Sequence, residues 1–212
     1  GAATQAAARF KEACPRNVPL TPPGRLAAMT GRLQATLDSV KLVRTPLEKF
    51  YESLSDEQKA RFNALGPSKT VQRKAQATAQ NDAAQNDTAQ KGCGGDKSGL
   101  TAFPITRIRD ELNPTDAQSK ELDKLSAAVD ESVKTLEAAC PDYVSRTPVG
   151  RLDTMQKRLE AMIAAANQIK PALESFYTSL DDDQKAQFNR LGVEAEADQQ
   201  QHSSVRHRST HR

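Results

Sequence analysis

The sequence is poor in aromatic residues and has no long apolar run. Of its 212 residues, 4% are aromatic and none is Trp. This composition is unusual for an enzyme core and is typical of a polar, helix-rich chain. No apolar stretch approaches the ~20 residues of a membrane span, because even the segment Ala161–Ile169 contains Asn167 and Gln168. The sequence therefore predicts an all-α protein without membrane insertion.

Residues that carry catalytic or metal chemistry are few and far apart. The three histidines fall within residues 202–212, and the three cysteines have no CxxC spacing. Neither a Cys/His zinc site nor a Ser/His/Asp or Cys/His constellation is available, and no glycine pattern for nucleotides is present. The acidic run 181–183 is explained by the helix macrodipole. We therefore expect no enzyme activity, no metal and no cofactor.

The charges are nearly balanced, with 30 Lys and Arg against 27 Asp and Glu. Nucleic-acid binding needs a basic stripe that releases several counterions. Here basic and acidic residues alternate on the same predicted helices, so we expect no nucleic-acid partner.

The chain contains an internal duplication. Cys14–Gly66, the first repeat, aligns without a gap on Cys140–Gly192, the second repeat, and about half of the positions are identical. The identical positions include the predicted helix starts, apolar positions and helix ends. Two copies of one helical module are therefore expected.

The duplication and the composition divide the chain into four parts. Residues 1–66 form a first helical module that is incomplete at its N-terminus, and residues 93–192 form the second. Residues 67–92 contain Val71 as their only large aliphatic residue, so we expect a flexible linker that lets two separately folded modules move independently. The alternative is a partly helical connector. Residues 193–212 are expected to form a disordered polar tail.

In the second module, local signals predict where two helices begin and end. Thr115 and Gln118 have the spacing of a capping box, and the apolar stripe that follows ends at Cys140. Thr147, followed by Pro148, starts a second helix of about 32 residues. The spacing therefore predicts two long amphipathic helices.

A third, short helix is predicted to start at Asp181, with Gln184 at the third helical position. The first module carries the same signals, at Thr21 for its long helix and at Ser55 with Gln58 for its short helix. We assign these motif glutamines to helix capping.

Two further features concern the long helices and the first module. Each long helix contains one interior proline, Pro46 or Pro171, which predicts a bend and a concave face. Gly1 aligns with Ala127, so nothing in the first module corresponds to Thr115–Gln118. We therefore expect an upstream segment with the missing helix start, a fourth cysteine and an export signal.

Three segments resemble the LTxxQ motif of the Spy/CpxP family of periplasmic stress proteins and chaperones. They are Leu54–Gln58, Leu180–Gln184 and Leu112–Gln118. Ser and Asp replace the motif Thr in the first two, and Asn113 and Pro114 are inserted in the third, yet all of these helix starts can still be capped. The tandem arrangement looks like a branch of the family found in alpha-proteobacteria.

This resemblance implies an ATP-independent chaperone or envelope-stress protein of the periplasm. Such proteins bind unfolded or partly folded proteins on a cradle-shaped surface and are often dimers. The alternative is a helical interaction or signalling module that docks one specific envelope partner. A metal-sensing protein is the third option, but the two modules contain no histidine.

Six residues are candidates for client binding, because cationic heads beside flexible methionine suit weak binding to many partners. The alternative reading places both methionines in the core seam with the arginines at its rim. The aromatic pairs Phe50–Tyr51 and Phe176–Tyr177 are expected to pack between the long and short helices. The six candidates are Arg25, Met29, Arg32, Arg151, Met155 and Arg158.

The cysteines give a last expectation. If Phe103–Leu112 folds back along the following helix, Cys93 and Cys140 reach the same end of the module. An oxidising compartment is implied only by the family resemblance, and there a Cys93–Cys140 disulfide with Cys14 free is expected. The alternative is three reduced thiols.

Overall fold

The computed structural model describes residues 21–64, 105–140 and 147–191, together with positions 4, 5, 8 and 145. All regular elements within these residues are helices, which confirms the predicted all-α class. No helix in this part of the chain combines the length and the apolarity needed to cross a membrane. The predicted linker 67–92 and tail 193–212 lie outside the described residues, so the domain boundaries stay predictions.

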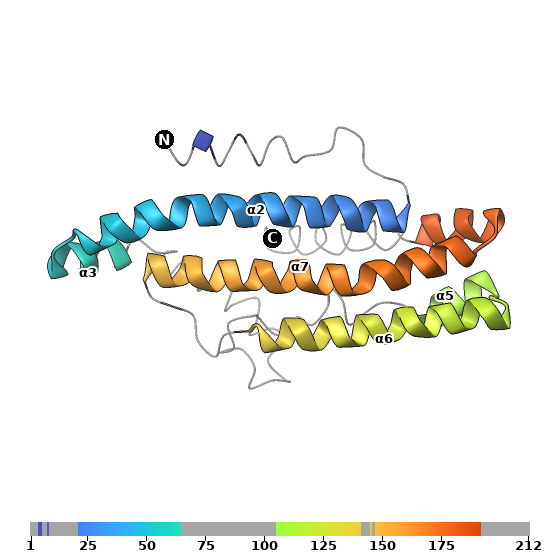
Figure 1. The fold of residues 1–212 in the computed structure, drawn as a ribbon. Coiled ribbons are helices and arrows are strands. Elements are labelled where there is room, and N and C mark those ends of the chain that lie inside the picture. The colour runs from blue at the N-terminus through green and yellow to red at the C-terminus, as the bar shows by residue number, and fades with distance from the viewer. Residues whose placement is uncertain are drawn as a thin grey trace, which may run out of the picture.

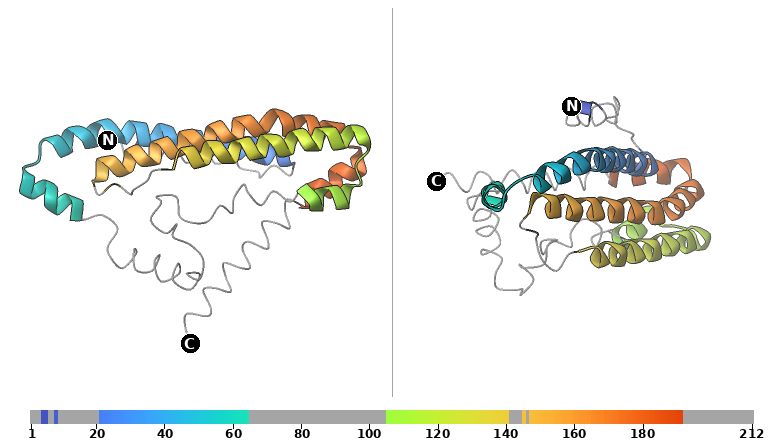
Figure 2. Two further views of the ribbon diagram at one scale, coloured as in Figure 1. Left: turned by 90° about the horizontal axis from the view of Figure 1, so that it is seen from below. Right: turned by 60° about the vertical axis from the view of Figure 1, so that its left-hand side comes forward.

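Three long helices lie side by side in one layer, with α7 in the middle (Figure 1). They are α2 (Pro22–Glu52), α6 (Asp116–Ala138) and α7 (Pro148–Ser179). The short helix α3 (Asp56–Ala64) follows α2, α5 (Ile105–Leu112) precedes α6, and residues 182–191 form a helical segment after α7. Figure 2 shows that the layer arches and that the short helices at both ends turn toward the same side.

The starts of the two long repeat helices follow from their shared Thr-Pro sequence. Thr21 Oγ1 accepts the Gly24 amide at 3.2 Å, and Thr147 Oγ1 accepts the Gly150 amide at 3.1 Å. A proline follows each threonine, where a missing amide proton costs nothing. A Cβ at Gly150 would overlap the side chain of Ser145, so a larger residue at this position would require that side chain to move.

The main core lies between α6 and α7 and extends under α5 and residues 182–191. Buried Ser132 lies at this interface, and its hydroxyl proton is shared between the carbonyl oxygens of Ala128, 2.7 Å from Oγ, and Ala165, 3.1 Å from Oγ. A buried hydroxyl with such partners avoids the cost of an unsatisfied polar group. The buried apolar residues of this core are Ile108, Leu112, Leu122, Leu125, Val129, Ile169, Leu173, Phe176, Leu180 and Phe188.

A second, smaller core joins the two repeats. Leu33 and Leu37 of α2 share this cluster with Leu159 and Ile163 of α7, which are their equivalents in the second repeat. Equivalent residues meet in one cluster when a two-fold axis passes through it. The two repeats therefore pack as an antiparallel pair around a pseudo-two-fold axis. The sequence predicted two modules that move independently. In this structure the two repeats instead share an apolar cluster between α2 and α7.

Ion pairs fix one end of the α2–α7 interface. The Arg44 guanidinium lies 3.2 Å from Asp153 and donates to Gln156 Oε1 at 2.9 Å. Asp153 also accepts from Lys157 at 2.9 Å. The Lys157 hydrogen bond, together with the charges of Lys157 and Arg44, lowers the pKa of the Asp153 carboxyl, although partial burial opposes this shift.

A second carboxylate of the same interface is Glu160. It accepts from Gln156 at 3.0 Å and lies 3.3 Å from the Lys41 ammonium of α2. The Gln156 hydrogen bond is the main cause of its lowered pKa, with Lys41 and Arg44 adding to it and burial opposing it. Side chains at this seam are half exposed, so the pairs orient the helices more than they stabilise them.

Candidate functional site

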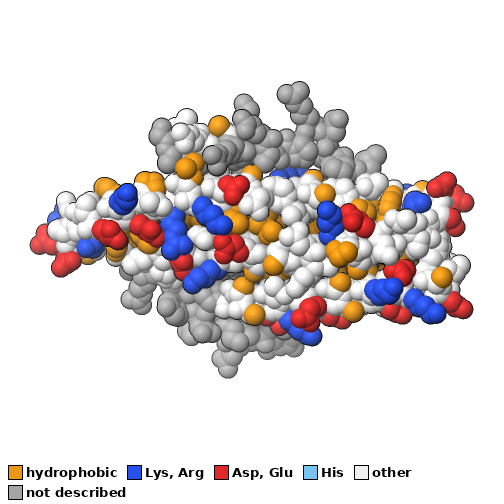
Figure 3. Space-filling model, in the orientation of Figure 1, with side chains coloured by type: hydrophobic (Ala, Val, Ile, Leu, Met, Phe, Trp, Pro, Cys, Tyr) orange, Lys and Arg blue, Asp and Glu red, His pale blue; other side chains and the backbone are white. Residues whose placement is uncertain are grey.

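The two candidate methionines are exposed. Met29 has 45% and Met155 has 46% of its surface accessible, although each lies four positions before a leucine of the α2–α7 seam, Leu33 or Leu159. The reading that placed them in the core seam is therefore wrong for both side chains. The face of the layer shown in Figure 3 has hydrophobic side chains along this seam, interspersed with basic and acidic ones.

The candidate arginines lie on the same helical faces as the methionines. Arg32 and Arg158 are exposed, whereas Arg25 and Arg151 are half buried. In each helix the two arginines lie seven positions apart, which is about two turns, with the methionine between them. The structure therefore presents two equivalent clusters, one on α2 and one on α7.

The pseudo-two-fold axis relates these two clusters. The axis runs perpendicular to the helix pair, so it returns each face of the layer to itself. Met29 and Met155 therefore lie on the same face. In the register set by Lys41 with Glu160 and Arg44 with Gln156, about 16 residues separate the two methionines along the pair, which is roughly 24 Å. We call this surface the methionine face, defined by the two methionines and the four arginines.

The aromatic pairs pack between the long and the short helices, as the sequence predicted. Phe50 meets Phe62 of α3 edge to face, with ring centres 5.6 Å apart at 79°. Phe176 meets Phe188 in the same way, at 5.5 Å and 86°. The local geometry of the two repeats is thus nearly identical. Burial is not, because Phe176 is 0% exposed and Phe50 is 50% exposed.

The motif residues form three capping boxes. The side-chain oxygen of the glutamine accepts the backbone N–H of the residue at the motif Thr position, at 2.9 Å for Ser55, 2.9 Å for Thr115 and 3.1 Å for Asp181. In return, the side-chain oxygens of Ser55, Thr115 and Asp181 accept the backbone N–H of the glutamine, at 3.3, 3.3 and 2.8 Å. The departures from Thr at two motifs therefore leave the capping geometry intact. The glutamines are Gln58, Gln118 and Gln184.

Two of the motif glutamines do more than cap. Gln118 Nε2 donates to Gln184 Oε1 at 2.8 Å, and Gln184 Nε2 donates to Gln118 Oε1 at 3.2 Å. Gln118 Nε2 also donates to the Ser179 carbonyl at 2.9 Å, and Gln184 Nε2 to the Leu112 carbonyl at 3.1 Å. This pair joins two helix starts that are distant in sequence. The sequence signal was available, since a capping glutamine uses only its oxygen and leaves its amide group free to donate.

A metal site receives no support from the part of the chain that the structure describes. The described residues contain no group of three or more His, Cys, Asp or Glu that could hold a metal ion. Cys140 is disulfide-bonded, and its partner lies outside the described residues. Cys14 and Cys93 also lie outside them, so the Cys93–Cys140 pairing stays a prediction.

The comparison with protein families gives one match. The family model described as "LTXXQ motif family protein" matches residues 1–66 and 100–192, which include both repeats and most of the chain. Comparisons with curated proteins and with solved structures give no match.

Proposed function

Because the chain belongs to the LTXXQ motif family, we propose that it is an ATP-independent chaperone or envelope-stress protein of the periplasm. In this proposal it is not an enzyme, and its partners are unfolded or partly folded proteins. The observation that carries the proposal is the exposure of Met29 and Met155 at equivalent positions of one face.

The chemistry of the methionine face suits clients of varied sequence. Methionine is unbranched and polarizable, so it adapts to many apolar segments. The arginines beside it can pair with carboxylates and contact aromatic rings. Two equivalent clusters about 24 Å apart would hold one unfolded segment at two points, which raises avidity without a deep pocket.

The proposal is tested by adding the protein to an aggregating model client and measuring how far it suppresses the increase in light scattering. Without nucleotide, the wild-type chain should suppress aggregation at near-stoichiometric ratios. The double variant Met29→Ser, Met155→Ser should need several times more protein for the same effect. Both side chains are about half exposed, so the fold should survive the change.

A matched control separates the methionine face from exposed apolar surface in general. Phe50 is as exposed as the two methionines but lies near the far end of α2. Phe50→Ala should therefore leave suppression unchanged. An inert wild-type chain that binds a single envelope protein tightly would instead favour the specific interaction module, and equal loss with Phe50→Ala would refute a role for the methionine face.

A further inference from the structure

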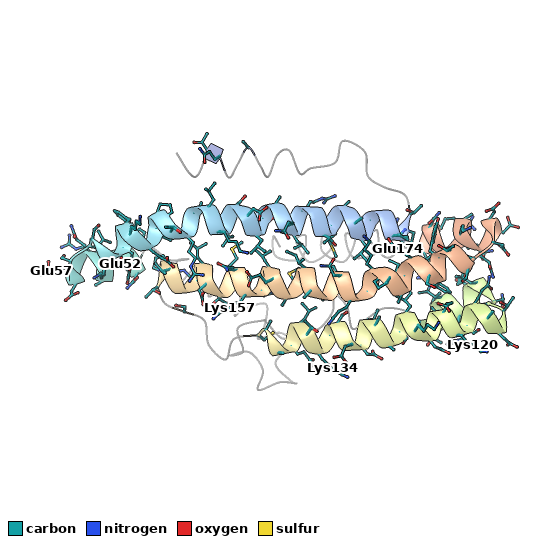
Figure 4. All side chains as sticks on the ribbon, viewed as in Figure 1. Glu52, Glu57, Lys120, Lys134, Lys157 and Glu174 are labelled. Carbon is teal, nitrogen blue, oxygen red and sulfur yellow. The ribbon has the colours of Figure 1, made fainter. Side chains whose placement is uncertain are left out.

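The chain contains three methionines, and they differ in how far the fold buries them. Met29 and Met155 keep 45% and 46% of their surface accessible, and neither belongs to one of the two cores. Met162 is half buried, and the next residue, Ile163, packs against the smaller core. Figure 4 labels Lys157, two positions after Met155, toward the N-terminal end of α7. The two residues of the methionine face are therefore the more open of the three to reagents in solution.

An exposed thioether is a target for two-electron oxidants such as hydrogen peroxide. The sulfur lone pair attacks one peroxide oxygen, the O–O bond breaks, and that oxygen stays on the sulfur as a sulfoxide. The other oxygen leaves as hydroxide and becomes water when it takes up the proton of the transferred oxygen. Sulfur is thereby oxidised by two electrons and the peroxide is reduced by two. Because the peroxide must reach the sulfur, an exposed methionine reacts before a buried one.

Each exposed methionine has an arginine three positions later, which makes the two side chains neighbours on the helix surface. These arginines are Arg32 and Arg158, and both are exposed. Within the part of the chain that the structure describes, neither guanidinium forms an ion pair. A thioether sulfur is only a weak acceptor, whereas a sulfoxide adds an oxygen to which a guanidinium N–H can donate. Oxidation thus gives each cluster an internal polar partner.

This reaction removes both properties that suit the methionine face to varied clients. A sulfoxide is polar, so it no longer offers an adaptable apolar surface. An arginine that donates to it is less available to client carboxylates and aromatic rings. Since Met29 and Met155 occupy equivalent positions, one oxidant changes both points at which a client segment is held.

We propose that Met29 and Met155 are oxidation sites, and that their conversion to methionine sulfoxide switches client binding off. This inference rests on the proposed function. The periplasm, where the protein is proposed to act, is an oxidising compartment. The switch is reversible, because methionine sulfoxide reductases restore the thioether at the expense of thiols.

Peptide mass analysis of the full chain during treatment with hydrogen peroxide tests the sites themselves. In the folded protein, Met29 and Met155 should be oxidised several times faster than Met162. In urea the three rates should become equal, because the fold no longer shields Met162. Helical circular dichroism should stay unchanged in the oxidised folded protein, since neither exposed methionine belongs to a core.

The light-scattering assay with the model client tests the switch. Oxidised wild-type protein should need several times more protein for the same suppression than untreated wild type. The double variant Met29→Leu, Met155→Leu keeps apolar side chains that cannot accept oxygen, so peroxide should leave its own untreated value unchanged. The matched variant Met162→Leu should remain as sensitive to peroxide as wild type.

Reduction completes the test and separates its outcomes. The two methionine sulfoxide reductases, one for each sulfoxide epimer, should restore suppression to oxidised wild type, with untreated protein carried through the same reduction as the control. Oxidation of Met162 at the same rate in the folded protein, or equal loss of suppression in the double leucine variant, would overturn the switch and leave the proposed function standing. An untreated wild-type chain that suppresses nothing would overturn both.

Discussion

The repeat allows one substitution to be made twice in the same local geometry. Phe176 and Phe50 are equivalent residues in near-identical aromatic contacts, yet one is fully buried and the other is half exposed. We predict that Phe176→Ala destabilises the protein much more than Phe50→Ala. The difference reports the burial that α5 and α6 give Phe176, to which Leu26 of α2 also contributes at that end.

The magnitudes follow from the buried area. A buried Phe removes about 150–250 Å² from water, and Phe→Ala in a core costs about 3–5 kcal/mol once the cavity is included. Phe50 buries only about half of that area, and truncating it leaves a depression open to solvent instead of a closed cavity. Phe50→Ala should therefore lower the free energy of unfolding by about 1–2 kcal/mol. The two variants should therefore differ by about 2 kcal/mol.

Urea denaturation followed by helical circular dichroism measures both values. The comparison requires that the free energy of unfolding falls with urea concentration at the same slope in both variants. A changed slope would mean that a different amount of surface is exposed on unfolding. Tyr177→Phe offers a control, since it keeps the ring against Phe188 and should change stability little. Equal losses for Phe176→Ala and Phe50→Ala would refute the argument that α5 and α6 cover only one end.

Three further predictions concern charge, chain cleavage and cysteine chemistry. The lowered pKa values of Asp153 and Glu160 stabilise the fold above about pH 4, and this contribution is lost as the pH falls through the lowered folded-state values. Asp153→Asn should flatten the fall in melting temperature between neutral and acid pH, and a steeper fall would contradict this. Limited proteolysis should cut first within residues 67–92, with fragments that co-elute because α2 and α7 share a core; separating fragments would contradict the shared core. Non-reducing peptide mapping should yield a Cys93–Cys140 peptide, and any link from Cys140 to another cysteine would disprove that pairing.

The local part of the fold could be predicted because its causes are local. Thr147 and Thr115 are recognisable as helix starts, since a cap depends on residues within one turn. The packing of Phe176 between the long helix and the short helix that follows it was likewise predicted, and the structure shows its ring against Phe188.

The nonlocal part could not be predicted in the same way. An apolar stripe shows that a helix is buried on one side, but it does not say against which partner. For Met155 the sequence therefore left two readings open, an exposed client-binding residue and a core residue, because the choice depends on where the seam with α2 runs. The pairing of Gln118 with Gln184 also needs the two motifs to meet in space, which periodicity does not report.

The duplication explains why the two ends of the molecule can differ. In a symmetric homodimer every contact would occur twice, whereas a duplicated chain can change one copy alone. Arg44 pairs with Asp153, but their equivalents in the other repeat are Lys170 and Ala27, so the ion pair forms at one end only. At the other end Leu26 packs against the main core instead. Charge at one end and apolar packing at the other thus favour a single antiparallel register, and the same asymmetry leaves Phe50 half exposed where its counterpart Phe176 is buried.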